Sequence, residues 1–279
     1  MPSNNDEALK IFVFGYNRYD SMSTSLMLEQ EDINHTVLCH TAEAGKLFVE
    51  HNTAKPERII ATNCPRGLAY QRNFALDSMK EGEWALFLVD DLKSVSELRN
   101  YDRTREAKLP ITLTNQNHYG KRFDHNITMT QFVQRAKELI KVCMKHDCNL
   151  GGFAGINNPL YRAKHWSYNV LADGRAWVVR KTHLRFDENV QLIDDLCWTA
   201  LNIKHFNLVI VNQWVLPDCK RYSAGAFGSI EERMPQKLAE AKYLVETYPE
   251  LISFKEKAGW PFGSHVVLRQ RNKPKHLMK

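Results

Sequence analysis

Two adjacent acids, Asp90-Asp91, follow the apolar run Phe87-Leu-Val89 and are well placed for chemistry. Neighbouring carboxylates repel each other unless a cation or hydrogen bonds compensate them, and hard divalent cations prefer oxygen ligands beside phosphates. A carboxylate that holds Mg²⁺ or Mn²⁺ against a diphosphate makes the diphosphate a better leaving group. Asp91 is our candidate metal ligand, with Asp90 beside it. The alternative is that Asp91 caps a helix beginning at Leu92.

A second acid pair, Asp194-Asp195, stands at the start of a helix predicted over 193–205. A carboxylate here could act as a general base and take the proton of a hydroxyl group that attacks a substrate. Asp195 is our candidate base, because it points away from the apolar face of the helix, and Asp194 is its neighbour. The alternative for both acids is a favourable interaction with the helix N-terminus.

The first 92 residues are predicted to alternate strands and helices, and so to position the first acid pair. Short continuous apolar strands separated by helices indicate a parallel sheet that is covered on both faces, which is an α/β, Rossmann-type doubly wound arrangement. In such sheets ligands bind beyond the carboxyl ends of the strands. The predicted strands span 9–14, 35–39, 58–62 and 84–89, and the predicted helices span 21–32, 42–51 and 67–79.

The remaining chain is predicted to elaborate the same single domain, 1–279. Residues 8–92 form its nucleotide-binding half, and the polar stretch 93–127, without periodicity, is expected to be a lid or loop. Residues 128–279 form the second half. They include a clear helix over 128–146 and the dipeptide Asp173-Gly174, which predicts a hairpin between two flanking apolar runs.

Composition and absent motifs exclude several classes of protein. The net charge of +6 is mildly basic, and the six cysteines show no CxxC spacing, so reduced thiols are expected. No apolar run approaches the roughly 18 residues of a membrane span, and the polar N-terminus is unlike a signal peptide. We therefore expect a soluble, cytoplasmic protein without a membrane partner. GxGxxG, P-loop, GxSxG and HExxH motifs are missing, which argues against dinucleotide binding, P-loop phosphoryl transfer, serine hydrolysis and zincin chemistry.

The stretch from Ile11 to Asp91 resembles glycosyltransferases of the GT-A fold, in which a nucleotide-sugar lies across the strand ends. In that family an Arg-Asn pair on a helix precedes a DxD-type acid pair by about one helix and one strand. Arg72-Asn73 precedes Asp90-Asp91 in this way, although Val89 stands where the usual motif has its first acid.

The GT-A resemblance implies a metal-dependent enzyme that uses a UDP-sugar and Mn²⁺ or Mg²⁺. It assigns the nucleotide side of the site to the segment after the first strand, the diphosphate to the Arg-Asn pair with Asp90 beside it, and the metal to Asp91. A histidine near the C-terminus can complete the metal shell, although a surface-loop histidine is the alternative. The implied donor and metal residues, in this order, are Tyr16, Asn17, Arg18, Arg72, Asn73, Asp90, Asp91 and His265.

A basic and aromatic stretch over 160–186 suggests the acceptor, because phosphate neutralisation and base stacking need these residue types. Six Lys or Arg residues stand there against one acid. Together with Gly151-Gly-Phe-Ala-Gly155 and the second acid pair, the chain resembles the TET-associated glycosyltransferases.

That second resemblance implies transfer to the hydroxyl of 5-hydroxymethylcytosine, or a related hydroxymethylpyrimidine, in DNA. If the chain is viral, it implies the cytoplasm of the host cell. Two alternatives stay open: a GT-A enzyme acting on a glycan or small molecule, and an inactive GT-A-like module that binds nucleic acid. The sequence does not define the sugar, the anomeric outcome or the oligomeric state.

Overall fold

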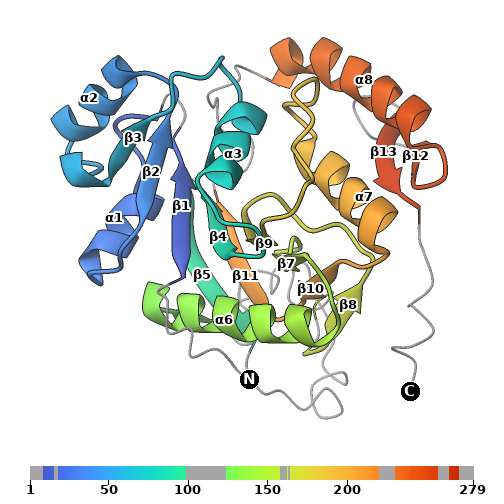
Figure 1. The fold of residues 1–279 in the computed structure, drawn as a ribbon, viewed down its shortest axis with the longest axis horizontal. Coiled ribbons are helices and arrows are strands. Elements are labelled where there is room, and N and C mark those ends of the chain that lie inside the picture. Colours follow the sequence, from blue (N-terminus) through green and yellow to red (C-terminus); the bar gives the residue numbers. More distant parts are fainter. Residues whose placement is uncertain are drawn as a thin grey trace, which may run out of the picture.

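The fold was analysed in a computed structural model. It describes residues 9–15, 18–98, 124–157, 162, 164–219, 230–256 and 264–269, apart from the side chains at 230–231, 256 and 264–265. The described chain is a mixed α/β structure whose main sheet has eight strands in the order β3-β2-β1-β4-β9-β7-β10-β8 (Figure 1).

Strands β1 to β4 form the parallel half of the main sheet, as the alternating pattern predicted. β1 pairs in parallel with both β2 and β4, and β2 pairs in parallel with β3. Each predicted strand and helix of this half is present, and no end is shifted by more than two residues. The elements are β1 (Lys10–Phe14), α1 (Ser23–Gln30), β2 (Thr36–Cys39), α2 (Ala42–Glu50), the 3₁₀ turn η1 (Pro56–Arg58), β3 (Ile59–Ala61), α3 (Leu68–Asp77) and β4 (Trp84–Val89).

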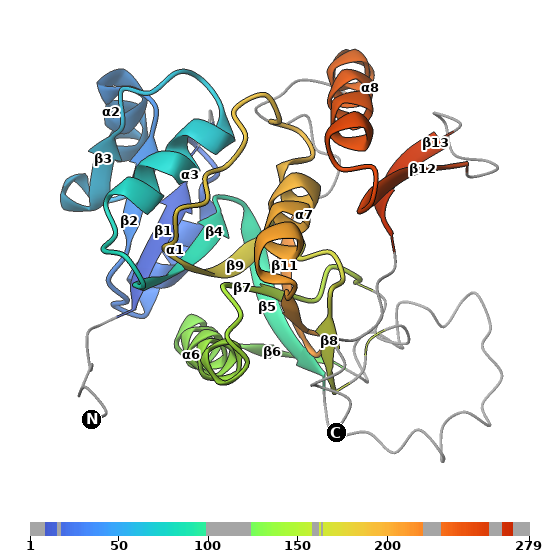
Figure 2. The same ribbon diagram turned by 45° about the vertical axis from the view of Figure 1, so that its right-hand side comes forward.

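Helices cover both faces of this sheet, because successive strand side chains point to opposite faces and both sets are apolar. Ile11 and Val13 of β1 pack into one core cluster with α1, α2 and α6 (Met129–Lys145). Phe12 and Phe14 pack into the other cluster with α3, α7 (Asp194–Phe206) and α8 (Ile230–Thr247). Figure 2 shows α6 and α7 on opposite sides of the sheet. The doubly covered arrangement predicted for the first half is therefore present.

The second half makes the sheet mixed. β9 (Ala176–Arg180) runs antiparallel to β4 and to β7 (Leu150–Phe153), while β10 (Ile210–Asn212) runs parallel to β7. The edge strand β8 (Trp166–Tyr168) is antiparallel to β10. The hairpin predicted around Asp173-Gly174 is therefore wrong. β8 pairs with β10, whereas β9 pairs with β4 and β7, so the runs on either side of Asp173-Gly174 do not pair with each other. The first four residues of β9 are buried, as expected for a central strand with both faces covered.

A smaller antiparallel sheet, β11-β5-β6, lies beside the main one. Its strands are β5 (Leu92–Leu98), β6 (Asp124–Ile127) and β11 (Val215–Cys219). Residues 93–98 and 124–127, expected to be irregular, are therefore strands, and residues 99–123 lie outside the described part. The alternative of a helix capped by Asp91 is wrong, because a strand begins at Leu92. A third sheet is the hairpin of β12 (Ile252–Glu256) and β13 (Ser264–Leu268).

All six cysteines are free in the structure, as their scattered positions predicted. Among the helices of the described chain, none combines the length and the apolar character that crossing a membrane requires.

Candidate active site

Arg18 meets the acid pair Asp90-Asp91 at the point where the strand order of the sheet reverses. β1 has β2 on one side and β4 on the other, and open α/β sheets bind ligands at the carboxyl ends of strands at such a switch point. Arg18 follows β1, and its Nη1 lies 3.0 Å from Asp90 Oδ1 and 2.5 Å from Asp91 Oδ2. Three of the predicted donor and metal residues are thus brought together. Tyr16 and Asn17 lie outside the described residues.

The acid pair is buried and its backbone is held by the start of α1. Asp90 is 5% exposed and Asp91 is 8% exposed, so Asp91 does not project into solvent as the end of a strand would suggest. Thr24 Oγ1 donates to Val89 O at 2.7 Å and accepts from Leu92 N at 3.0 Å, while Thr24 N donates to Asp90 O at 3.2 Å. These bonds fix the turn between β4 and β5 and therefore the origin of both carboxylates.

The segment Asp173-Gly174-Arg175 lies directly beside this turn. Val89 N donates to Arg175 O at 3.1 Å, which ties the segment to the residue preceding the acid pair. The Arg175 side chain holds Asp173 through two bonds, Nε to Oδ1 at 2.6 Å and Nη2 to Oδ2 at 3.0 Å, and its backbone N–H also donates to Oδ1 at 3.2 Å. A β-carbon added at Gly155 would lie 2.8 Å from Asp173 Oδ2, so the glycine-rich segment makes room for this carboxylate. Asp173 is a site residue that the sequence interpretation treated only as part of a turn.

Asp195, the candidate base, lies across Gly174 from the acid pair. A β-carbon at Gly174 would lie 3.2 Å from Asp195 Cβ, and Leu196 N donates to Asp195 Oδ1 at 2.8 Å. Burial raises the pKa of Asp195 to about 6, with a further rise from the charge of Asp173, while hydrogen bonds and Arg72 oppose the shift. The residue as a whole is half-buried. A carboxylate with a pKa in this range is ionised at neutral pH and can still take a proton.

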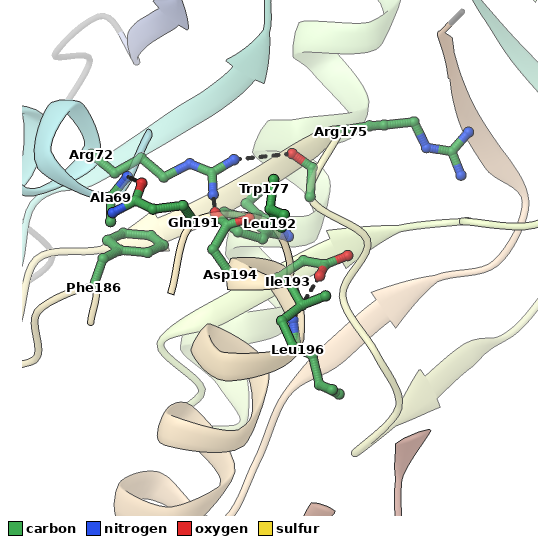
Figure 3. Close-up of polar contacts among 12 residues, drawn as sticks. Ala69, Arg72, Arg175, Trp177, Phe186, Gln191, Leu192, Ile193, Asp194 and Leu196 are labelled. Carbon is green, nitrogen blue, oxygen red and sulfur yellow. Dashed lines mark hydrogen bonds and ion pairs between the residues drawn. The ribbon is translucent and has the colours of Figure 1, made fainter. Parts of the chain in front are cut away.

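Arg72 is fully enclosed rather than placed at the rim of the site. It is 2% exposed, forms an ion pair with Asp194, and donates from Nη2 to Gly174 O at 3.4 Å (Figure 3). Its guanidinium also lies over the Trp177 ring, 4.3 Å from the centroid. Burial lowers the pKa of Arg72 to about 9, which leaves it a cation at neutral pH. A direct contact with a donor diphosphate does not fit this placement, so Arg72 positions Asp194 and its neighbour.

The side-chain amide of Asn73 likewise forms its hydrogen bonds within the protein. Its Nδ2 donates to Phe186 O at 3.0 Å and to Glu188 Oε1 at 3.1 Å, and its Oδ1 accepts from Phe186 N at 2.8 Å. The residue is 4% exposed. Asn73 therefore fastens the segment that leads toward α7, and it does not face the strand ends as the resemblance implied.

Glu240 of α8 holds the approach to α7 and was not identified from the sequence. This 3% exposed carboxylate accepts from three consecutive backbone N–H groups, Gln191 at 3.0 Å, Leu192 at 2.9 Å and Ile193 at 3.2 Å. A sequence signal exists, because Glu240 stands four residues before the buried Leu244 on the same face of α8. A charged residue in an apolar stripe marks a position that needs polar partners.

Gln191 connects α3 to the same segment. Its side chain accepts from Ala69 N at 3.3 Å (Figure 3). The same side chain donates to Glu188 O at 2.8 Å. The start of α7 is thus fixed from two sides, by α3 and by α8.

The acid pair fits a divalent cation that is held jointly by carboxylates and by the phosphates of a substrate. Within the described part of the chain, no three His, Cys, Asp or Glu side chains are grouped to hold a metal ion. Mg²⁺ is, however, often bound by one or two carboxylates together with substrate phosphates. Asp90 and Asp91 already share a positively charged partner, Arg18, and they are the residues that would hold such a cation, where it would supply positive charge beside the phosphates.

His265 is not brought to this acid pair. It pairs with Lys255 in the β12–β13 hairpin, and its side chain lies outside the described residues. In both views α7 lies between this hairpin and β4 (Figures 1 and 2). The structure therefore gives no support for His265 as a second metal ligand.

The basic and aromatic stretch over 160–186 does not form one surface. Arg180 lies opposite Trp84 at the start of β4, whereas Ala176 lies opposite Leu88 near the acid pair. Arg180 and Ala176 therefore lie at opposite ends of β9, roughly 13 Å apart at about 3.3 Å per residue. Trp177 and Phe186 are core residues, with exposures of 0% and 3%. The described basic and aromatic side chains of this stretch therefore do not gather on one face, and DNA as the acceptor stays a prediction.

Comparisons with known proteins add no family assignment. No protein-family model matches the chain, and no curated protein matches its sequence.

Proposed function

We propose that this protein is a nucleotide-sugar glycosyltransferase that moves a sugar from a UDP-sugar to a hydroxyl acceptor with the help of a divalent cation. One observation carries the proposal. Asp195, a half-buried carboxylate with a raised pKa, packs against Gly174 of the segment Asp173-Gly174-Arg175, and the Arg175 carbonyl of that segment accepts from the residue before the buried acid pair at the switch point of the sheet. The resemblance to the GT-A fold agrees with a nucleotide site at this place.

The two acids of the pair would hold the cation, with Asp91 as the main ligand. When bound, the cation supplies positive charge that stabilises the departing diphosphate. Asp91 and Asp90 would thus act on the leaving diphosphate through the cation, and Asp195 would act on the hydroxyl group of the acceptor.

Asp195 would act as the general base. An alcohol has a pKa far above neutrality, so it must lose its proton as its oxygen attacks the anomeric carbon. The new carbon–oxygen bond forms, the bond to the diphosphate oxygen breaks with its electron pair, and Asp195 takes the proton. This assignment applies to an inverting reaction. Arg72 with Asp194, and Glu240, would keep the base in place.

For the acceptor we propose DNA that carries a hydroxymethylated pyrimidine such as 5-hydroxymethylcytosine. This part rests on the resemblance to the TET-associated glycosyltransferases and on the net charge of +6. A specific observation favours a smaller acceptor as the second candidate, because Arg180 and Lys181 lie at the edge of the sheet away from the acid pair.

The test is an assay of UDP release from a panel of UDP-sugars with Mn²⁺. Acceptors are duplex DNA with 5-hydroxymethylcytosine, unmodified duplex DNA, and a set of simple glycans, and products are identified by mass spectrometry. We expect a sugar adduct on the modified nucleoside and none on unmodified DNA. Adducts on glycans alone would select the smaller acceptor.

A variant control separates the metal assignment from the rest. Asp91→Asn should lose most UDP release, because it removes charge that would bind the cation. Release at the wild-type rate would remove Asp91 from the metal site. If no donor is turned over but the protein binds duplex DNA with a steep salt dependence, the protein is a nucleic-acid-binding module instead.

A further inference from the structure

Arg18 stands where the proposed function requires a metal ion. Its Nη1 contacts both carboxylates of the acid pair, at 3.0 Å to Asp90 and 2.5 Å to Asp91. The side chains of the two acids are 7% and 11% exposed, whereas that of Arg18 is 24% exposed. The guanidinium therefore covers the acids from the more open side.

We propose that Arg18 is a displaceable counter-ion, which neutralises Asp90-Asp91 in the nucleotide-free protein and withdraws when a metal–nucleotide complex binds. The inference rests on the proposed function, because it assigns the same acid pair to the metal. It goes further by making Arg18 a positioning residue that determines when the metal can enter.

Electrostatics requires the exchange. Two buried adjacent carboxylates without a cation are strongly unfavourable, so the nucleotide-free protein needs a positive partner at this place. A guanidinium within contact distance of a divalent cation is repelled by it, so both cannot share the same carboxylate oxygens. Arg18 must therefore leave the carboxylate oxygens that the metal takes, Asp90 Oδ1 and Asp91 Oδ2 in the present arrangement.

The position of Arg18 allows it to leave. It precedes α1, and its backbone carbonyl accepts a hydrogen bond from Ser21 N at 3.2 Å, which anchors the main chain and leaves the long side chain to move. A guanidinium that leaves the acids still carries charge and a fork of donors that suits phosphate oxygens. The diphosphate that arrives with the metal offers it such a partner.

The exchange predicts an order of binding. A metal ion alone must displace Arg18 without offering it a new partner, so it should bind weakly. A metal that arrives with UDP brings the phosphate oxygens that receive Arg18, so the two ligands should bind cooperatively.

The experiment measures Mn²⁺ binding by electron paramagnetic resonance, with and without UDP, and needs no catalysis. Wild type should bind Mn²⁺ weakly alone and more tightly with UDP. Arg18→Gln should bind Mn²⁺ alone about tenfold or more tightly than wild type, because a repelling charge is gone. Arg18→Lys, which keeps the charge, should stay close to wild type. Asp91→Asn combined with Arg18→Gln should lose the gain.

Arg135→Gln is the matched control. Arg135 also bridges two carboxylates, those of Glu97 and Glu138, each at 3.0 Å, and Glu97 lies near the far end of β5 from Asp91. This variant should bind Mn²⁺ as wild type does. Thermal melting checks that each variant is folded, and Arg18→Met, which also lacks the charge and should show the same gain in Mn²⁺ affinity, replaces Arg18→Gln if that variant is unstable.

The outcomes separate the inference from the proposed function. If wild type binds Mn²⁺ with UDP but Arg18→Gln shows no gain without UDP, the counter-ion role is overturned and the proposed function stands. If Arg18→Gln gains Mn²⁺ affinity but UDP never adds to it in wild type, the counter-ion role stands and the nucleotide assignment falls. If no variant binds Mn²⁺ under any condition, both are overturned.

Discussion

Arg72 and Asp194 form a buried ion pair that joins the middle of α3 to the first residue of α7. The guanidinium is enclosed by Trp177 and Phe186, whose ring centroids lie 4.3 and 5.4 Å away (Figure 3). The residue after Asp194 is Asp195, the candidate base. The position of the base therefore depends on an arginine that a bound donor would not touch.

Removing the arginine should destabilise the protein strongly. In Arg72→Met the Asp194 carboxylate remains buried without its partner, which costs about 3–5 kcal/mol of unfolding free energy. Arg72→Met combined with Asp194→Leu should recover much of that loss, because neither charge is then left buried. Urea denaturation measures both. Arg185→Met, which breaks an exposed pair with Asp77, should cost no more than about 1 kcal/mol. Equal losses for Arg72→Met and Arg185→Met would contradict the role of the buried pair.

Asp195→Asn should lower the transfer rate about 10²–10⁴-fold while UDP binding stays normal. It should also stabilise the protein at neutral pH. The pKa of Asp195 is about 6 in the folded protein and about 4 when unfolded, so between these values the folded state binds more protons. Wild-type stability therefore falls as pH rises through this window. Melting temperatures should show the variant above wild type near neutral pH and close to it near pH 4.

Asp194→Asn is not a matched control for this variant, since it breaks the buried pair with Arg72. A transfer rate that survives Asp195→Asn would remove the general base and favour a retaining mechanism. Equal melting temperatures of wild type and Asp195→Asn at neutral pH would show that the carboxylate is not stabilised in its protonated form.

Asp173→Asn should lower the pKa of Asp195, because the negative charge of Asp173 is one cause of its rise. The acid limb of the pH–rate profile for transfer should then move to lower pH. Carbon-13 NMR titration of the Asp195 carboxyl gives the same answer without catalysis. Asp77→Asn, an exposed acid paired with Lys181, is the control and should leave the acid limb in place. An unmoved limb in Asp173→Asn would mean that the two acids do not interact.

Charge reversal at Arg180 and Lys181 should leave DNA binding and the acceptor KM unchanged. Lys181 lies 3.7 Å from Asp77 Oδ1, and Arg180 donates to Gly82 O at 3.4 Å, so both belong to the edge away from the acid pair. The glutamate variants should lose some stability, because Asp77 would then face a like charge. Retention on duplex DNA across a salt series measures the first effect, and weaker retention would restore the acceptor surface inferred from the sequence.

The parallel half of the sheet could be predicted because its signals are local. Runs such as Trp84–Val89 are short, apolar and separated by helices, and the acid pair after β4 follows directly from them. The order of strands in the second half could not be predicted this way. Asp173-Gly174 carries the signature of a hairpin turn, but burial of β9 on both faces outweighed that local preference.

The site was predicted in part for the same reason. Both acid pairs were identified, since each stands at the end of a recognisable element. The partners of Arg72 and Asn73 were not, because Asp194 and Phe186 lie far along the chain and no local spacing relates them. An arginine beside an asparagine in the middle of a short helix suggests an exposed pair, and only the tertiary fold shows that both are enclosed.

The contacts of Glu240 also relate the candidate site to the order in which the chain is synthesised. During synthesis the ribosome releases α7, with both of its aspartates, before it releases α8. Until then the three N–H groups at 191–193 have only water as a partner where Glu240 will later accept them. The start of α7 therefore has all of its partners only when α8, which is made later, has docked. An unfinished chain would carry the chemical groups of the site without their alignment.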